Sequence, residues 1–303
     1  MKTLTVVALL MAGSNLLFAA ESRPGSLSAE QRQKVEKAIP RKASVQPKTP
    51  RKILVVNLKI RDGKIINGHA SIPHGNLAIE LMGKRTGAYE AVFSNDIEMF
   101  RPEKLAQFDA ICFNNTGGVL FDDPELRLAL LDFVAGGKGF IGFHAAVATF
   151  VQYPKYDQFP AYGEMIGAYE NGGHPWKPDE TITLRVENPG HPVNKAFGGK
   201  GFEVSDEVFQ LMDGIYSRSK LLVLLSIDPE RTDMGPQRHI LPERRKDLDF
   251  PISWVKSYGN GRVFYSGLGH NPHIWWNAPI LRHFLDGIQF ALGDLEAATT
   301  PKN

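Results

Sequence analysis

Short apolar runs separated by polar or glycine-rich segments dominate the pattern of this chain after Lys52. Runs rich in Val, Ile and Phe that are bounded by turn residues are typical of buried strands. Such runs occur at 52–59, 89–94, 110–114 and 140–143. Between them, apolar residues at helical spacing predict helices over 73–85 and 123–134. This alternation predicts an α/β fold, with a doubly wound, mostly parallel sheet in a three-layer α/β/α sandwich.

The second half of the chain is richer in strands. Strands are expected at 181–187, 221–227, 253–258 and 262–265. The pair Asn260-Gly261 lies between the last two and predicts a hairpin or another tight connection, because this pair tolerates the positive φ angles of such turns. An amphipathic helix over 278–292 is expected to close the domain.

The N-terminal residues have the pattern of a secretory signal peptide, with one lysine, an apolar stretch over 4–20 and small residues at its end. Gly13, Ser14 and Asn15 interrupt this stretch, so it is too short to span a bilayer, and no stable membrane insertion is expected. We predict cleavage near Ala20 and an exported protein, either periplasmic or secreted. The remaining organisation is expected to be a basic, proline-containing linker at 21–51, one α/β domain at 52–295 and a flexible tail at 296–303.

The composition limits the classes of function. The net charge of the 303-residue chain is only +2, so the chain has no basic footprint for nucleic acid. A single cysteine, Cys112, excludes an internal disulfide, and its place in an apolar run predicts a buried, unreactive thiol. The stretch 137–142 matches G-x-G-x-x-G, but its glycines precede a strand instead of following one into a helix. No nucleotide cofactor is therefore expected.

Histidines provide the candidate chemistry. The run at 140–143 ends in His144, where a strand is expected to pass into a tight turn. His69, His174 and His270 also lie after predicted strands or in turn-rich loops. Ligands of open α/β sheets bind outside the carboxyl ends of the strands, so these imidazoles are expected to converge on one crevice. Imidazole can act there as a base, an acid or a metal ligand near neutral pH.

Acidic, amide and aromatic side chains complete the candidate set. Glu164 and Glu207 are the candidate carboxylates, and Asn115, in the loop after the run at 110–114, is a candidate substrate ligand. Tryptophan in a polar loop is a frequent platform for a sugar ring, although it fills a core about as often. Three tryptophans lie in loops beside histidines and are candidates for this role: Trp176, Trp275 and Trp276.

Several of these segments together resemble the trehalose-utilisation (ThuA-like) family. The resemblance extends over 51–293 and includes Gly142-Phe143-His144-Ala145-Ala146, Tyr162-Gly163-Glu164-Met165-Ile166-Gly167-Ala168, His174-Pro175-Trp176, Phe202-Glu203-Val204-Ser205-Asp206-Glu207 and Gly267-Leu268-Gly269-His270. It implies a class I glutamine-amidotransferase-like (flavodoxin-like) fold. Amidotransferases carry a nucleophilic cysteine where this chain has His144, so Cys-dependent glutamine hydrolysis is not expected. Residues 57–64 depart from the family pattern, which has a shorter glycine-rich loop before His69.

The resemblance implies an exported carbohydrate-catabolic enzyme that acts on trehalose-like disaccharides or their 3-keto derivatives. Histidine-based proton abstraction, with or without a metal, would lead to elimination, isomerisation or hydrolysis. The expected partners are a small carbohydrate substrate and, through functional coupling, a sugar oxidoreductase; a homo-oligomer is left open. The alternative function is a non-catalytic sugar-binding protein of the same fold.

Roles follow for the candidate residues. His144 is expected to be a base or a metal ligand, His174 an acid–base partner or a ligand, and Glu164 or Glu207 the carboxylate that orients them. The expected metal ligands are His69, His144 and His270. Imidazole and carboxylate donors would suit Zn²⁺, Mn²⁺ or Fe²⁺.

Overall fold

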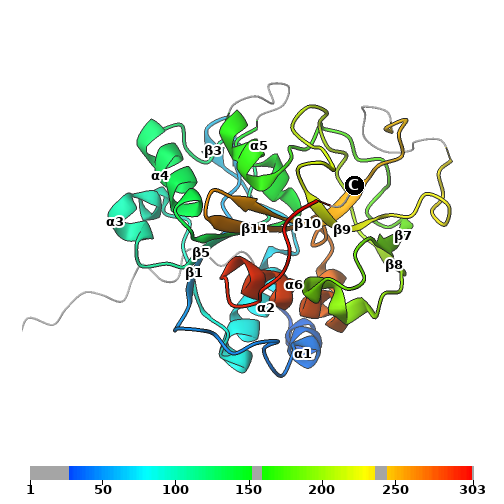
Figure 1. Cartoon of the computed structure of the whole chain (residues 1–303), viewed down its shortest axis with the longest axis horizontal. Helices are drawn as coiled ribbons and strands as arrows, with labels where there is room; N and C mark the ends of the chain where they lie inside the picture. The colour runs from blue at the N-terminus through cyan, green and yellow to red at the C-terminus, as the bar shows by residue number, and fades with distance from the viewer. Residues whose placement is uncertain (1–26, 152–158, 236–243, 302–303) are drawn as a thin grey trace, which may run out of the picture.

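The computed structural model describes residues 27–151, 159–235 and 244–301. Nine strands form one sheet in the order β4-β1-β5-β6-β11-β10-β9-β7-β8 (Figure 1). In its first half, each strand is parallel to its neighbours. These strands are β4 (Glu90–Phe93), β1 (Lys52–Val56), β5 (Ala110–Asn114), β6 (Gly139–Phe143) and β11 (Gly261–Ser266).

The second half of the sheet is antiparallel throughout. It contains β10 (Pro251–Tyr258), β9 (Leu222–Ile227), β7 (Thr181–Val186) and β8 (Phe202–Ser205). Because direction alternates from β11 to β8, β10 and β7 run against the other seven strands, and β8 points the same way as β6 and β11. The carboxyl ends of β1, β5, β6, β11 and β8 therefore face one edge of the sheet.

Helices cover both faces of the sheet, and two apolar clusters result. Along β1, Ile53 and Val55 belong to one cluster, and Leu54 and Val56 belong to the other, as the alternation of a strand buried on both faces requires. The first cluster includes α1 (Ala29–Ala38), α2 (Ile72–Thr86) and α6 (Ala278–Ala291); the second includes α3 (Pro102–Leu105), α4 (Pro124–Ala135) and α5 (Pro160–Ile166). The predicted α/β sandwich is confirmed.

Short 3-10 helices connect several of these elements. They are Ile97–Phe100, His144–Ala148, Pro192–Phe197 and Pro272–Trp276. A small hairpin that was not predicted, β2 (Ile60–Arg61) with β3 (Lys64–Ile65), fills the extra length between β1 and His69. Its turn residues Asp62 and Gly63 have φ angles of 50° and 70°, the positive values that a two-residue hairpin turn needs.

The segment before β1 is more ordered than the solvated linker that its composition predicts. Ser28 and Gln31 form a reciprocal capping box at the start of α1, which stabilises a helix start. Val35 and Ile39, four residues apart, are buried in the first cluster. Arg51 then pairs with Asp294 beyond α6 at 2.7 Å. The predicted linker is thus packed on the domain from Leu27 onward.

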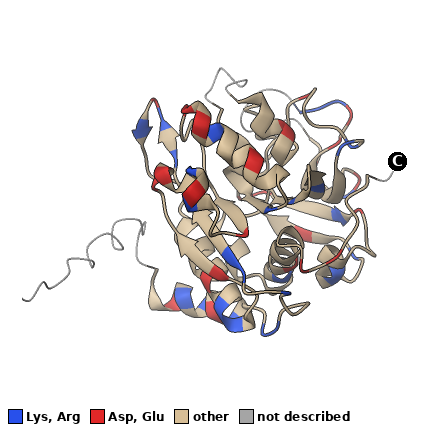
Figure 2. Ribbon diagram, turned by 60° about the vertical axis from the view of Figure 1, so that its left-hand side comes forward, with Lys and Arg blue, Asp and Glu red and all other residues tan. Residues whose placement is uncertain are grey.

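Both ends of the chain bear on the predicted domain organisation. The predicted signal peptide at 1–20 lies outside the described residues. Glu296, at the start of the predicted flexible tail, pairs with Lys48 and Arg262 at 2.8 Å each. Within the three described ranges, no helix has the length and apolarity needed to cross a membrane. Figure 2 shows Lys and Arg interspersed with Asp and Glu along the visible ribbon, in agreement with the net charge of +2.

Candidate functional site at the carboxyl edge of the sheet

His144 occupies the turn directly after β6, as the apolar run that precedes it predicts. Its φ angle of 45° lies in the left-handed region, which is costly for a residue with a side chain and is found mostly where the surroundings enforce it. The hydroxyl group of Tyr265 donates to the carbonyl oxygen of His144 at 2.7 Å. Such enforced positions cluster at functional sites.

The His144 ring is fully buried and has a defined orientation. Its Nδ1 lies 2.9 Å from the carbonyl oxygen of Gly267. Because a carbonyl only accepts, Nδ1 carries the proton in the neutral ring and Nε2 is an acceptor. Burial is the main cause that lowers the pKa of His144 and favours this neutral form. Phe209 stacks against the ring at 4.6 Å between centroids.

Three imidazoles surround a common point. The ring centroids of His69 and His144 are 5.0 Å apart, and that of His270 is 5.1 Å from each of them. His69 lies between the β2–β3 hairpin and α2, and His270 follows β11. Burial above all lowers the pKa of His69 to about 2, so this ring is neutral too.

Glu207 supplies a carboxylate to the three imidazoles from the segment that follows β8. Its Oε2 lies 3.5 Å from Nε2 of His144 and 3.7 Å from Nε2 of His270. Its Oε1 lies 3.0 Å from Nδ1 of His174. Burial alone would raise the pKa of the Glu207 carboxyl group, but His144 and His174 hold it well below its usual range. Glu207 is therefore ionised and contacts both predicted catalytic histidines.

The donor set of His69, His144, His270 and Glu207 fits a divalent cation. One donor atom from each residue lies within 4.8 Å of all the others. Donors that bind Zn²⁺ at about 2.1 Å in tetrahedral geometry are about 3.4 Å apart, so closure around an ion needs shifts of about an ångström. His144 Nε2 and Glu207 Oε2 face each other at 3.5 Å, and a cation between them would be bound by both.

Asp206, to which the sequence analysis assigned no role, fixes the loop that carries His270. Its carboxylate accepts backbone N–H groups from Gly269 at 2.7 Å, His270 at 3.3 Å and Asn271 at 2.7 Å. The carbonyl oxygen of Gly269, which belongs to the same peptide group as the His270 N–H, accepts a hydrogen bond from Ser71 Oγ at 2.7 Å. The N–H and the carbonyl group of the Gly269–His270 peptide therefore both have hydrogen-bond partners, and these bonds fix the backbone that carries His270.

Asn115 lies next to His144 at the same edge. Asn114 and Phe143 are partners in the β5–β6 register, so the two residues that follow them are neighbours. Asn115 is buried with a φ angle of 59°, and its Nδ2 donates to the Gly269 carbonyl at 3.4 Å. Its Oδ1 accepts no hydrogen bond from any residue that the structure describes. This oxygen remains a candidate substrate ligand.

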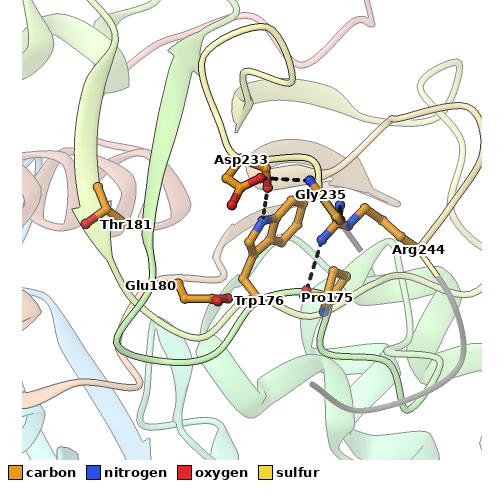
Figure 3. Close-up of a pocket in the computed structure, with 7 residues that line it drawn as sticks. All are labelled: Pro175, Trp176, Glu180, Thr181, Asp233, Gly235 and Arg244. Carbon is orange, nitrogen blue, oxygen red and sulfur yellow. Dashed lines mark hydrogen bonds between the residues drawn. The ribbon is translucent and has the colours of Figure 1, made fainter. Parts of the chain in front are cut away.

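Of the three tryptophans expected to bind sugar, Trp176 and Trp275 are buried in the protein. Trp275 is fully buried, and its Nε1 donates to the Gly269 carbonyl at 3.2 Å. Trp176 is 2 % exposed; its Nε1 donates to the Asp233 carbonyl at 3.0 Å, and the Arg244 guanidinium lies 4.5 Å from its ring centroid (Figure 3). A pocket of about 170 Å³ lies beside this pair. Trp276, partly buried, packs against the His74 ring at 5.5 Å.

Glu164 is not brought to the histidines. It lies exposed on α5, where its carboxylate is 3.5 Å from the Lys220 ammonium. A second carboxylate that sequence reasoning missed, besides Asp206, is Glu170, which accepts the Gly172 backbone N–H at 2.6 Å. Burial is the main cause that raises the pKa of Glu170, which also interacts electrostatically with His174, Glu207 and Lys59. The sequence signal that could have identified Glu170 is its position just before the glycine-rich loop that carries His174.

The comparisons with known proteins agree with this architecture. The family described as ThuA, trehalose utilisation, matches residues 53–291. A ThuA-like protein of Bacteroides uniformis has a TM-score of 0.62 at 22% identity, with 80% of this chain and 92% of that chain covered. A ThuA-like protein of Parabacteroides merdae has a TM-score of 0.56 at 17% identity, with 84% and 98% covered.

A larger enzyme contains a similar fold. The β-galactosidase of Bacillus circulans has a TM-score of 0.50 at 11% identity, and the match covers 83% of this chain and 32% of that chain. No curated protein matches the sequence. The structural matches show a shared fold, in agreement with the class I glutamine-amidotransferase-like type. Since the family match covers most of the chain, this protein belongs to the ThuA, trehalose-utilisation, family.

Proposed function

We propose that this protein is a carbohydrate-active enzyme that acts on trehalose-like disaccharides or their 3-keto derivatives through proton abstraction by histidine. The observation that carries the proposal is the cluster of three imidazoles around the Glu207 carboxylate. Clusters of perturbed titratable groups at the ligand-binding edge of an α/β sheet are the usual mark of an active site. The family description, trehalose utilisation, supports trehalose-like sugars as the proposed substrate class.

His69, His144, His270 and Glu207 would hold a divalent metal ion such as Zn²⁺, Mn²⁺ or Fe²⁺. When bound, the ion would supply Lewis-acid polarisation of a carbonyl oxygen. The residues of the chain position the substrate and move the proton. Glu207 Oε1, 3.0 Å from His174 Nδ1, favours the tautomer with the proton on Nδ1. His174 Nε2 is then the base of choice.

The proposed reaction begins at the carbon between the keto group and the anomeric carbon. His174 removes its proton, the C–H electron pair forms a carbon–carbon double bond, and the carbonyl oxygen becomes an enolate oxygen. When the carbonyl re-forms, the glycosidic C–O bond breaks, and the departing oxygen takes the proton from the imidazolium of His174. The products of this elimination are an unsaturated keto sugar and a free sugar, and no external oxidant is needed.

Incubation with trehalose and with 3-keto-trehalose, each with and without a chelator, tests this function by chromatography of the products. The expected result is turnover of one of the two sugars that stops with the chelator and with His144→Ala. His273→Ala is the matched control, because His273 is exposed on the neighbouring 3-10 helix. If the metal-loaded protein turns over neither sugar, the proposal is wrong.

The alternative, a non-catalytic sugar-binding protein, depended on Trp176, Trp275 and Trp276 as platforms. Burial of Trp176 and Trp275 leaves that alternative less support than the histidine cluster gives to an enzyme. We also propose export with cleavage near Ala20, from the apolar stretch at 4–20. Mass spectrometry of the protein from intact cells should find an N-terminus near Glu21; a periplasmic protein that begins at Met1 would contradict it.

A further inference from the structure

Lys59 lies beside the histidine cluster, although nothing in the sequence pattern singles it out. It follows β1, where the chain is tied to the segment after β5: the Gly117 N–H donates to the Leu58 carbonyl at 3.2 Å, and the Ile60 N–H donates to the Gly117 carbonyl at 2.9 Å. The side-chain stem crosses Gly117, since a β-carbon at Gly117 would lie 3.5 Å from Lys59 Cε. The aliphatic part of Lys59 therefore packs on the loop that carries Asn115.

The ammonium group of Lys59 has no direct partner among the described residues. The side chain is partly buried, yet within the described ranges no hydrogen bond or ion pair within 4.0 Å reaches its Nζ. The charge still acts on the site. Burial, and secondarily Arg61, lower the pKa of Lys59, whereas attraction by Glu207 and Glu170 opposes this shift. The Lys59 charge in turn contributes to the low pKa of His69.

A partly buried lysine without a salt bridge loses some hydration of its charge without gaining a partner. A lysine with a purely structural role would be expected to pair with a carboxylate or to extend into solvent. Local arrangements that oppose stability are concentrated at functional sites, where a ligand completes them. The Lys59 ammonium is therefore available to bind a ligand oxygen near the His69 imidazole and the Glu207 carboxylate.

We propose that the Lys59 ammonium binds the oxygen of the sugar that becomes negatively charged during the reaction. This inference rests on the proposed function and assigns a substrate-binding residue to the same site. During proton abstraction the C–H electron pair shifts toward the keto oxygen, and the fixed ammonium stabilises the charge that develops there. Lys59 keeps its protons throughout. When the glycosidic bond breaks, the charge leaves the keto oxygen and the hydrogen bond weakens again.

The test compares Lys59→Met, which keeps the stem and removes the charge, with Lys64→Met on the exposed strand β3. We expect Lys59→Met to lower kcat for the keto sugar about 10²–10³-fold, the effect of one lost oxyanion-stabilising donor. Bound metal should be unchanged. The Tm should be equal to or above that of the wild type, because the substitution removes an unpaired charge on a partly buried side chain. Lys59→Arg should recover part of the activity, and Lys64→Met should change nothing.

Binding in an inactive background separates this inference from the proposed function. Calorimetry with 3-keto-trehalose compares His144→Ala with His144→Ala/Lys59→Met, and the second variant should bind at least tenfold more weakly. If the wild type turns over the sugar and Lys59→Met equals it, or if Lys59→Met mainly lowers the Tm, Lys59 has no such role. If the sugar binds through Lys59 without turnover, the reaction is wrong but the binding role stands. If the sugar neither binds nor reacts, both proposals are overturned.

Discussion

His144 and His283 lie in different regions of the molecule but begin from the same chemistry. Both rings are fully buried, and in both Nδ1 lies 2.9 Å from a backbone carbonyl oxygen, that of Gly267 for His144 and that of Val193 for His283. Burial lowers the pKa of both. The two histidines are therefore neutral and have the same tautomer.

The two rings differ at Nε2. His283 Nε2 lies 3.0 Å from the Ser253 hydroxyl group, which suits the neutral ring when the hydroxyl proton points to Nε2 instead of to the Tyr265 carbonyl oxygen at 2.8 Å. His144 Nε2 instead faces the Glu207 carboxylate at 3.5 Å, among two further imidazoles. A buried histidine with a complete hydrogen-bond set stabilises a fold, whereas one whose acceptor faces a carboxylate is arranged for a cation or a proton.

The largest expected effect is the loss of turnover in His144→Ala. His144 is a proposed metal ligand, and its removal should lower the rate at least as much as the loss of a general acid–base group does, about 10²–10⁴-fold. The stability cost should stay under about 2 kcal/mol. Because His144 has a positive φ angle, His144→Gly should be at least as stable as His144→Ala. Steady-state kinetics and denaturant unfolding measure the two quantities.

Wild-type turnover by His144→Ala on a confirmed substrate would remove His144 from the mechanism. If both the Ala and Gly variants fail to fold, His144 is a structural histidine like His283. Metal analysis of the purified variants separates loss of a ligand from loss of a base.

The next effect is on stability and concerns His283→Ala. This variant leaves a cavity between α6 and the sheet and deprives Ser253 Oγ and the Val193 carbonyl of a partner. We expect a loss of about 2–4 kcal/mol in the free energy of unfolding, with turnover per folded molecule unchanged. A His283→Ala variant that is as stable as the wild type but inactive would show that His283 has a functional role and is not a structural histidine.

The sequence predicted both residues of this contact, His144 and the candidate carboxylate Glu207, but not that Glu207 rather than Glu164 reaches the ring. His144 was located because an apolar run ends at it, and this signal is local. Glu207 reaches the cluster from the end of β8, at the opposite edge of the sheet from β4. That strand order depends on pairings between distant segments, which periodicity does not encode. Lys59 and Asp206 were missed for the same reason, since their roles depend on tertiary neighbours and backbone N–H groups.

Metal binding tests whether the histidine cluster around His144, and not His283, holds a cation. Added Zn²⁺ at about 100 times its Kd should stabilise the folded wild-type protein by about 2.7 kcal/mol, because a ligand that binds only the folded state shifts unfolding by mass action. His270→Ala and Glu207→Gln should lose this stabilisation, since each removes one donor. His283→Gln should keep it. Thermal unfolding with and without metal measures the shift; equal shifts in all four proteins would place the metal elsewhere.

The smallest expected effect is the acid dependence of stability, and its sign follows from burial. Burial lowers the pKa of His283 to about 4 in the folded protein, against about 6.5 in an unfolded chain. Between these values the unfolded chain binds a proton at His283 that the folded protein does not, so stability falls as the pH falls from 6.5 toward 4. In His283→Gln this slope should be smaller by up to about 1.4 kcal/mol per pH unit. His273→Gln, at an exposed position, is the control. Urea unfolding of the metal-free proteins at several pH values measures the slopes. Identical slopes for the wild type and His283→Gln would show that His283 takes up its proton over the same pH range in the folded and the unfolded protein, and that its hydrogen bonds do not favour the neutral ring.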